Sequence, residues 1–330
     1  MSFDQAYIED IAKRLEKGDR RALARAITVV EAGGEAAQNL VKLVYQRSGK
    51  AHLIGVTGSP GVGKSTLVDA LVTQMRNADK KVAVLAIDPS SPFTGGAILG
   101  DRIRMQDHTL DPNVYIRSMA NRGHTGGVAM ATYDAVRMLE AFGFDVVIIE
   151  TVGVGQSELA IASTADTTIL VLMPGSGDDI QAIKSGIMEI GDIFVVNKGD
   201  LPGANKSATE IIASLELAKL PTNWHPPVLV AVSENGEGVD KIWQAVQDHR
   251  QFLTESDMIS KRRLTKIKAE LSEIVAEIAR GKLEQSMKDS ASVQELLTDI
   301  VDLKLDPRTA AANILSSLNG NAEKAGSKTK

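Results

Sequence analysis

A glycine-rich stretch in the first quarter of the chain ends in a lysine followed by two hydroxyl residues. It fits the pattern G-x-x-x-x-G-K-[ST], in which glycines let the backbone curl until successive N–H groups face phosphate oxygens. In this pattern Lys64 contacts the β- and γ-phosphates, and the hydroxyl of Ser65 is a ligand of Mg²⁺. We therefore expect a site for a nucleoside triphosphate with Mg²⁺, formed by Gly58, Ser59, Pro60, Gly61, Val62, Gly63, Lys64, Ser65 and Thr66.

A second motif indicates which base the nucleotide carries. The apolar run 193–196 is followed by Asn197, Lys198, Gly199 and Asp200, the N-K-x-D form that reads guanine. The carboxylate of Asp200 can accept from the N1–H and the 2-amino group of guanine, and adenine offers neither donor. A site that bonds a group can reject an analogue lacking it by about 10⁴-fold, which favours GTP over ATP. The turn 232–235 stands where a backbone amide normally contacts the guanine oxygen, which adds Ser233, Glu234 and Asn235.

Three acidic residues are candidates for the metal and for hydrolysis. Glu150 ends the apolar run 145–150 in the place of a D-x-x-G motif, so it would hold the Mg²⁺ shell through water, and the N–H of Gly153 would follow the γ-phosphate. Asp88 ends another predicted strand, whereas Asp101 lies in a loop. Either could reach the metal or the attacking water, and Asp88 is the stronger metal candidate because the carboxyl end of a strand is fixed near the phosphates. The expected catalytic set is Lys64, Asp88, Asp101 and Glu150, and the expected metal set is Ser65 with the same three acids.

The residue after Gly153 predicts slow hydrolysis. It is Val154, where many signalling GTPases carry the glutamine that orients water. A partner could supply the missing group, since an arginine finger is worth about 10³- to 10⁵-fold in rate. Arg104, Arg117 and Arg122 are internal alternatives, although arginines are more often surface residues.

The composition excludes several classes of protein. The net charge is −5 and the pI is about 5.7, so no basic field exists to neutralise the phosphates of a nucleic acid. The chain contains no apolar run long enough for a membrane span, and its start does not resemble a signal or transit peptide. Because it has no cysteine, it has no disulfides and no thiolate metal site. We expect a cytoplasmic protein with no nucleic-acid and no membrane partner.

The spacing of apolar residues divides the chain into three segments. Residues 1–48 have the spacing of helices, and residues 256–330 return to it. Between them, residues 49–255 alternate apolar runs with helical patterns, which predicts an α/β P-loop NTPase fold with a mostly parallel sheet and helices on both faces. The nucleotide then lies at the carboxyl ends of the strands. Strands are expected near 52–57, 82–87, 114–117, 145–150, 168–173, 193–197 and 228–232.

The last segment carries a narrow apolar stripe with spacings of three and four residues. One interpretation is that the stripe packs on the protein's own core. The other is a helical dimerisation arm, because a protruding helical hairpin after a complete nucleotide-binding domain needs an apolar partner. The stripe consists of Leu264, Ile267, Leu271, Ile274 and Ile278.

Five motifs in this order resemble the MeaB/ArgK family of G-protein chaperones of methylmalonyl-CoA mutase. They are V-T-G-S-P-G-V-G-K-S-T at 56–66, A-I-D-P-S-S-P at 86–92, G-G-A-I-L-G-D-R at 95–102, E-T-V-G-V-G-Q at 150–156 and N-K-G-D at 197–200. The resemblance covers nearly the whole chain. It implies a homodimeric GTPase that uses Mg²⁺, cycles between GTP and GDP, gates adenosylcobalamin loading of the mutase and protects the mutase from inactivation.

The resemblance also assigns roles to residues. It implies that Asp88, Asp101 and Glu150 serve Mg²⁺ and hydrolysis, and that the segment from Gly175 to Lys184, with Asp178 and Asp179, relays the nucleotide state to the mutase. The residues alone show only a flexible loop with an acidic N-cap before a helix, on which Lys184 is an ordinary exposed residue.

Two other functions stay open at this point. A phosphotransferase acting on a basic-amino-acid transport system would need a base at an acceptor hydroxyl or guanidine, for which Asp101 could serve, but the N-K-G-D motif argues for a switch. A metal-insertion GTPase would need clusters of cysteine and histidine, and the five histidines are scattered.

Overall fold

A computed structural model describes residues 3–89, 108, 110–121, 127–151, 164–175, 190–217, 223–314 and 316. The chain forms two compact units, Met1–Ile267 and Lys268–Lys330. The first unit contains an N-terminal group of helices and the whole sheet, so it contains the elements that position the expected nucleotide site. The second unit is helical.

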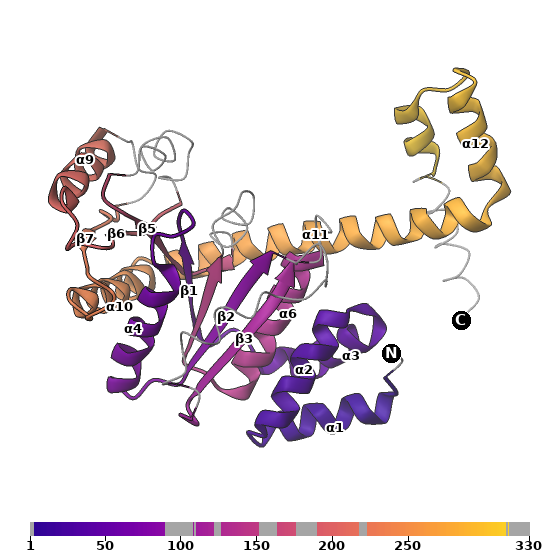
Figure 1. Ribbon diagram of the computed structural model, residues 1–330. Coiled ribbons are helices and arrows are strands. Elements are labelled where there is room, and N and C mark those ends of the chain that lie inside the picture. The colour runs from indigo at the N-terminus through magenta and orange to yellow at the C-terminus, as the bar shows by residue number, and fades with distance from the viewer. Residues whose placement is uncertain are drawn as a thin grey trace. The chain divides into compact units, whose positions relative to one another are not determined.

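The N-terminal helices are α1 (Gln5–Glu16), α2 (Arg20–Ala32) and α3 (Gly34–Val44). The carboxylates of Asp4 and Asp19 accept backbone N–H groups of the first turns of α1 and α2, which satisfies donors that a helix start leaves without partners. The apolar faces of all three helices are buried together with α6 (Gly127–Phe142) against one face of the sheet. The predicted N-terminal helices are therefore part of the core of the nucleotide domain (Figure 1).

Within the described residues the sheet has seven strands in the order β3-β2-β4-β1-β5-β6-β7, and every neighbouring pair is parallel. This confirms the predicted fold class. Two predicted strands were too short: β2 continues past residue 87 to Pro89 and β3 past residue 117 to Asn121, because their last residues pair with each other. The strands are β1 (His52–Thr57), β2 (Val82–Pro89), β3 (Val114–Asn121), β4 (Val146–Thr151), β5 (Thr167–Leu172), β6 (Ile193–Val196) and β7 (Val228–Val230).

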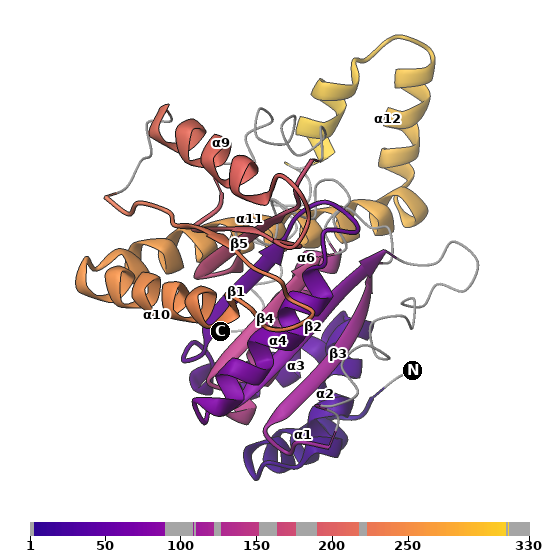
Figure 2. The same cartoon turned by 60° about the vertical axis from the view of Figure 1, so that its left-hand side comes forward.

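Side chains alternate between two apolar cores along the strands. In β2, Ala83 and Leu85 face the N-terminal helices and α6, whereas Val82 and Val84 face α4 (Lys64–Asn77) and α10 (Val239–Glu255). The helices α4 and α10 lie beside each other on that second face (Figure 2). A third apolar cluster joins α9 (Ala204–Leu217) to β5 and β6. Both faces of the sheet are therefore covered, as its nearly continuous apolar strands require.

The C-terminal helices are α11 (Met258–Asp289) and α12 (Ala291–Val301). In the second unit, the α11 residues Leu271, Val275 and Ile278 are 57%, 58% and 50% exposed. These apolar residues of the predicted stripe are therefore largely exposed among the described residues, although Ile274, which the spacing placed on it, is only partly exposed. No helix in the described residues is both long and apolar enough to cross a membrane.

Candidate nucleotide site

The phosphate-binding pattern lies between β1 and α4, as its chemistry requires. The strand ends at Thr57 and the helix begins at Lys64, so residues 58–63 form the connecting loop. Gly58 has φ 144°, and a Cβ there would lie 2.1 Å from the carbonyl oxygen of Val171 in β5. Only glycine lets the loop leave β1 at this point, because any side chain would collide with the neighbouring strand. The pattern therefore has the strand–loop–helix context that gives it meaning.

Lys64 extends back over the loop from the first turn of α4. Its Nζ donates to the carbonyl oxygens of Gly58 and Ser59, at 2.7 and 2.9 Å, and the residue is only 6% exposed. These bonds hold a buried ammonium group against the loop, beside the N-terminal end of α4, where the backbone N–H groups and the helix dipole also favour an anion. The arrangement supplies positive charge where phosphate oxygens would bind.

Ser65 and Glu150 form the pair of oxygen groups expected for a metal. The Oγ of Ser65 donates to Oε1 of Glu150 at 2.6 Å, which joins the first turn of α4 to the end of β4. Both residues are buried, and next to them Thr151 donates a hydroxyl bond to Thr57 across the ends of β4 and β1. A hydroxyl and a carboxylate are hard oxygen ligands of the kind that Mg²⁺ prefers, so the pair fits this ion.

Asn197 joins the guanine motif to the phosphate loop. Its Nδ2 donates to the carbonyl oxygen of Val62 at 2.8 Å, and its Oδ1 accepts from the hydroxyl and the backbone N–H of Ser233 at 2.7 and 3.2 Å. A Cβ on Gly63 would lie 2.4 Å from Asn197 Nδ2, so this contact requires the glycine. Three segments that are far apart in the sequence thus meet at one buried amide.

The other residues that the sequence predicts to read the base lie around this amide. The N–H of Gly199 donates to the carbonyl oxygen of Ala231 at 2.9 Å, which ties the N-K-G-D turn to the end of β7. Lys198 has φ 56°, and Asp200, next in the turn after Gly199, is exposed. Asn235 holds its own turn by accepting from the N–H of Glu237. The exposed carboxylate of Asp200 is therefore accessible to a base.

Several expected site residues lie outside the described part of the chain. The backbone of Asp88 is described as part of β2, beside Ala120 of β3, but the position of its side chain is not described. Gly175 is described and follows β5 in a turn with φ 77°. Outside the described residues lie Asp101, Gly153, Asp178, Asp179 and Lys184, together with Val154, Arg104 and Arg122.

Arg117 pairs with a helix of the N-terminal group. Its guanidinium forms an ion pair with Glu31 of α2, and both side chains are mostly buried. An arginine held in this way stabilises the packing of α2 on β3 and is a poor candidate for the internal arginine finger.

Two features of the site were not found from the sequence. The bridge from Asn197 to Val62 connects motifs that the pattern treats as separate, and the Thr151–Thr57 bond connects strand ends that become neighbours only in the sheet. The position of Thr57 directly before the phosphate loop could have indicated a role at the site. A threonine in an apolar run is usual in any strand, however, so the sequence did not single it out.

Comparisons with known proteins agree with this geometry. Residues 23–288 match the family model of the methylmalonyl-CoA mutase-associated GTPase MeaB. A Pyrococcus horikoshii protein named "Putative GTPase" is 46% identical over 316 residues, which covers 95% of this chain and 99% of that protein. GTPase ArgK of Escherichia coli is 38% identical over 270 residues, covering 79% of this chain and 81% of ArgK.

A more distant relative and a solved structure extend the comparison. The mitochondrial methylmalonic aciduria type A homolog of Caenorhabditis elegans is 35% identical over 339 residues, covering 97% of this chain and 85% of the homolog. A crystal structure of an LAO/AO transport system kinase superposes with a TM-score of 0.71 at 27% identity and covers 97% of this chain and all of that one. With a phosphate loop, a guanine motif and these relatives, the chain is a GTP hydrolase that belongs to the MeaB family of GTPases.

Proposed function

We propose that this GTPase is a chaperone of an adenosylcobalamin-dependent methylmalonyl-CoA mutase, which gates cofactor loading and protects the mutase from inactivation. The match of residues 23–288 to a family described as mutase-associated is the observation that carries the proposal. The name of the Caenorhabditis elegans relative points to methylmalonate metabolism as well. The partner would be the mutase, and the reaction would serve as a timed switch rather than as metabolism of GTP.

In the proposed reaction, water attacks the γ-phosphorus of GTP in line with the bond to GDP, and this bond breaks to release phosphate. Lys64 supplies charge to the β- and γ-phosphates from its position against the loop carbonyls. Ser65 and Glu150 would hold Mg²⁺, which when bound neutralises the charge of the phosphates. We assign Asp88 and Asp101 to the metal shell or the attacking water, and the N–H of Gly153 to the γ-phosphate. We expect slow hydrolysis without a partner because Val154 cannot orient water.

Base recognition in this proposal belongs to the turn that starts at Asn197. The buried Asn197 amide fixes the turn to the phosphate loop, so that the exposed carboxylate of Asp200 can meet the N1–H and amino group of guanine. Ser233, bonded to the same amide, brings its own turn within reach of the guanine oxygen. GTP and GDP are the nucleotides that such a site binds.

Two surfaces would meet protein partners in this proposal. The segment from Gly175 to Lys184, with Asp178 and Asp179, would relay the nucleotide state to the mutase. The exposed apolar residues of α11 in the second unit would take part in a homodimer, because three large apolar side chains are half or more exposed there.

Phosphotransfer is the second candidate, and one observation favours it. The protein named LAO/AO transport system kinase is similar over nearly the whole chain. Transfer requires an acceptor hydroxyl or guanidine instead of water, so the two reactions differ in whether phosphate is released or retained on an acceptor. A metal-insertion role has no support among the described residues, where no group of three or more histidine and acidic side chains could hold a metal.

The test is steady-state hydrolysis of GTP and of ATP by the purified protein, alone and with an excess of adenosylcobalamin-dependent methylmalonyl-CoA mutase. The proposal predicts that the protein hydrolyses GTP but not ATP, and that the mutase strongly raises the rate of GTP hydrolysis. If the mutase did not change the rate of GTP hydrolysis and analytical ultracentrifugation detected no complex, the partnership would be contradicted. The assignment as a GTP hydrolase would still stand. Retention of labelled γ-phosphate on a protein acceptor would favour the kinase.

A further inference from the structure

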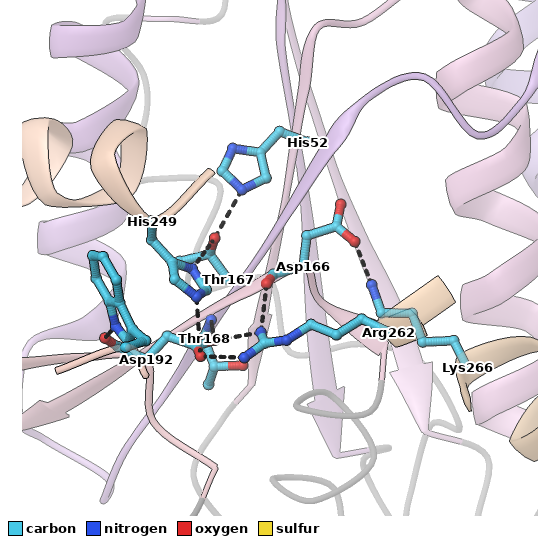
Figure 3. A network of polar contacts seen from close by, with 9 residues as sticks. His52, Asp166, Thr167, Thr168, Asp192, His249, Arg262 and Lys266 are labelled. Carbon is cyan, nitrogen blue, oxygen red and sulfur yellow. Dashed lines mark hydrogen bonds and ion pairs between the residues drawn. The ribbon is translucent and has the colours of Figure 1, made fainter. Parts of the chain in front are cut away.

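A group of buried charged residues lies at the edge of the sheet opposite the phosphate loop. Asp166 directly precedes β5 and Asp192 directly precedes β6, so both lie where these parallel strands begin. Their side chains are 3% and 9% exposed. Two basic residues near the start of α11 contact these carboxylates: Arg262 pairs with Asp192, and Lys266 pairs with Asp166. We call these four residues the α11 clasp (Figure 3).

Asp192 is bonded from three directions. Its carboxylate accepts from the backbone N–H of Thr168 in β5 at 2.9 Å, and from both terminal nitrogens of Arg262 at 2.7 and 3.0 Å. Its own carbonyl oxygen accepts from the indole N–H of Trp224 at 2.8 Å. A fork of two bonds from one guanidinium fixes direction as well as distance. Asp192 therefore links α11 to the start of β6 and to β5.

Asp166 completes the link. Its carboxylate accepts from the backbone N–H of Leu53 in β1 at 3.0 Å and forms an ion pair with Lys266. The carbonyl oxygen of Asp166 accepts from Arg262 at 2.8 Å, so a single guanidinium holds residues at the starts of both β5 and β6. Burial alone would raise the pKa of Asp166, but the nearby charge of Lys266 and the bonds from Lys266 and Leu53 lower the pKa overall. The carboxylate therefore stays charged and paired.

The two strands held by the clasp run directly to the nucleotide site. β5 has six residues and β6 has four, about 20 and 13 Å at the usual rise per residue. The far end of β5 lies against the phosphate loop, where the carbonyl of Val171 leaves no room for a side chain on Gly58. The far end of β6 leads into Asn197, whose N–H donates to the carbonyl oxygen of Leu172 at 2.8 Å. A shift of β5 against β6 would displace the phosphate loop from the guanine motif.

We propose that Arg262 and Lys266 are positioning residues of the nucleotide site, which act by fixing β5 and β6 at their starts and thereby the spacing of Gly58 and Asn197 at their ends. Both residues contact the starts of these strands, whereas the phosphate loop and the guanine motif lie at the strand ends. The inference goes beyond the proposed function and rests only on the nucleotide site, so it does not depend on the mutase partnership.

The test compares the affinity and dissociation rate of a fluorescent GDP analogue for full-length variants at a temperature where all are folded. Arg262→Gln removes the charge that holds both strand starts, and we expect GDP to bind about tenfold more weakly, which corresponds to about 1.4 kcal/mol. Arg262→Lys keeps the charge but cannot reach three acceptors at once, so an intermediate loss is expected. Lys266→Met keeps most of the apolar stem and serves if Arg262→Gln does not fold.

Two controls separate positioning from a general loss of stability. Lys261→Gln removes an exposed charge one residue earlier on α11 and should bind GDP normally. Ile27→Ala opens a cavity in the core under α2, where Ile27 is fully buried, and should lower the melting temperature without changing GDP binding. Hydrogen exchange of the Leu53 and Thr168 amides, which donate to the two clasp carboxylates, should rise in the Arg262 and Lys266 variants and not in Ile27→Ala.

The inference is overturned if folded Arg262→Gln binds GDP as tightly as the unaltered protein. It is also overturned if Ile27→Ala loses GDP affinity as much as Arg262→Gln does at equal melting temperature, because the clasp would then be structural only.

Discussion

At the carboxyl ends of the strands, which we call the carboxyl edge, backbone carbonyl oxygens accept the hydrogen bonds that hold the phosphate loop. Gly58 and Ser59 accept from Lys64, and Val62 accepts from Asn197. At the amino ends of the strands, which we call the amino edge, the acceptors include two buried carboxylates, those of Asp166 and Asp192. These form ion pairs with basic residues of α11. A loop that binds and releases a phosphate anion needs donors that are positioned without being neutralised. A fixed joint between strands and a helix can use complete ion pairs. The difference predicts that variants at the first edge change binding directly, whereas variants at the second lower stability and change binding only through β5 and β6.

The largest expected effect is that of Lys64→Ala. Removing this buried ammonium should reduce GTP affinity at least about 10²-fold, because charge at the phosphates is the main contribution of the loop. The free energy of unfolding should change little, since the bonds from the lysine to Gly58 and Ser59 lie within its own loop. Isothermal titration with GTP measures the first effect and urea unfolding the second. Lys42→Ala, an exposed lysine of α3, is the control. Unchanged GTP affinity in Lys64→Ala would contradict the phosphate site.

Asp200→Asn tests the guanine motif at the same edge. The amide can no longer accept from both donors of guanine, so GTP affinity should fall about 10²-fold, and affinity for xanthosine triphosphate should rise because its 2-oxo group can accept from the new amide. Competition between the two nucleotides for the unaltered and the variant protein measures the change. Equal affinity for GTP and xanthosine triphosphate in the unaltered protein would show that Asp200 does not read the base.

Asp192→Asn tests the amino edge against an exposed pair. Removing this charge leaves Arg262 partly buried without its partner, so the free energy of unfolding should fall by about 3 kcal/mol. The matched variant Asp10→Asn breaks the exposed Arg14 pair within α1 and should cost much less, because solvent screens this pair. Urea unfolding of both variants gives the difference. Equal losses would remove the contrast between the two edges.

The smallest expected effect is the pH dependence that one buried histidine, His249, contributes at the amino edge. His249 and His52 share the hydroxyl of Thr167, and burial lowers the pKa of His249 to about 4 and that of His52 to about 3. Because both pKa values lie below the unfolded value of about 6.5, the stability that these neutral histidines contribute is complete above pH 6.5 and is lost as the pH falls towards 4. For His249 the expected loss at pH 5 is about 2 kcal/mol.

Urea unfolding at pH 7.5 and pH 5 measures this effect. His249→Gln should make the pH dependence less steep and leave the part that His52 contributes, whereas His225→Gln, at an exposed position, should leave it unchanged. An equally steep loss of stability in His249→Gln would assign the acid sensitivity to other groups.

The sequence predicted more at the carboxyl edge than at the amino edge. The phosphate loop and the guanine motif are short, contiguous patterns whose chemistry depends on residues close together in the chain, so the sequence could assign both motifs to particular residues. Asp166 and Asp192 instead resemble ordinary turn acids before strands, and Arg262 and Lys266 lie in a basic run that resembles an exposed helix face. The extent of β3 was also missed, because residues 118–121 form a strand by pairing with β2 and not by apolar alternation.

The sequence by itself determined the fold class and the class of nucleotide. It also determined that the phosphate and base motifs lie at the same edge of the sheet, because both follow strands of a parallel sheet. These follow from local periodicity and from motifs in which every residue needed is within a few positions. Only the tertiary structure decided that Asn197 bonds the phosphate loop, that the N-terminal helices share the core of the sheet, and that α11 holds the starts of β5 and β6. The reason is that these contacts join residues whose proximity is created by the packing of the sheet, and a polar residue does not show in the sequence which distant partner will satisfy it once it is buried.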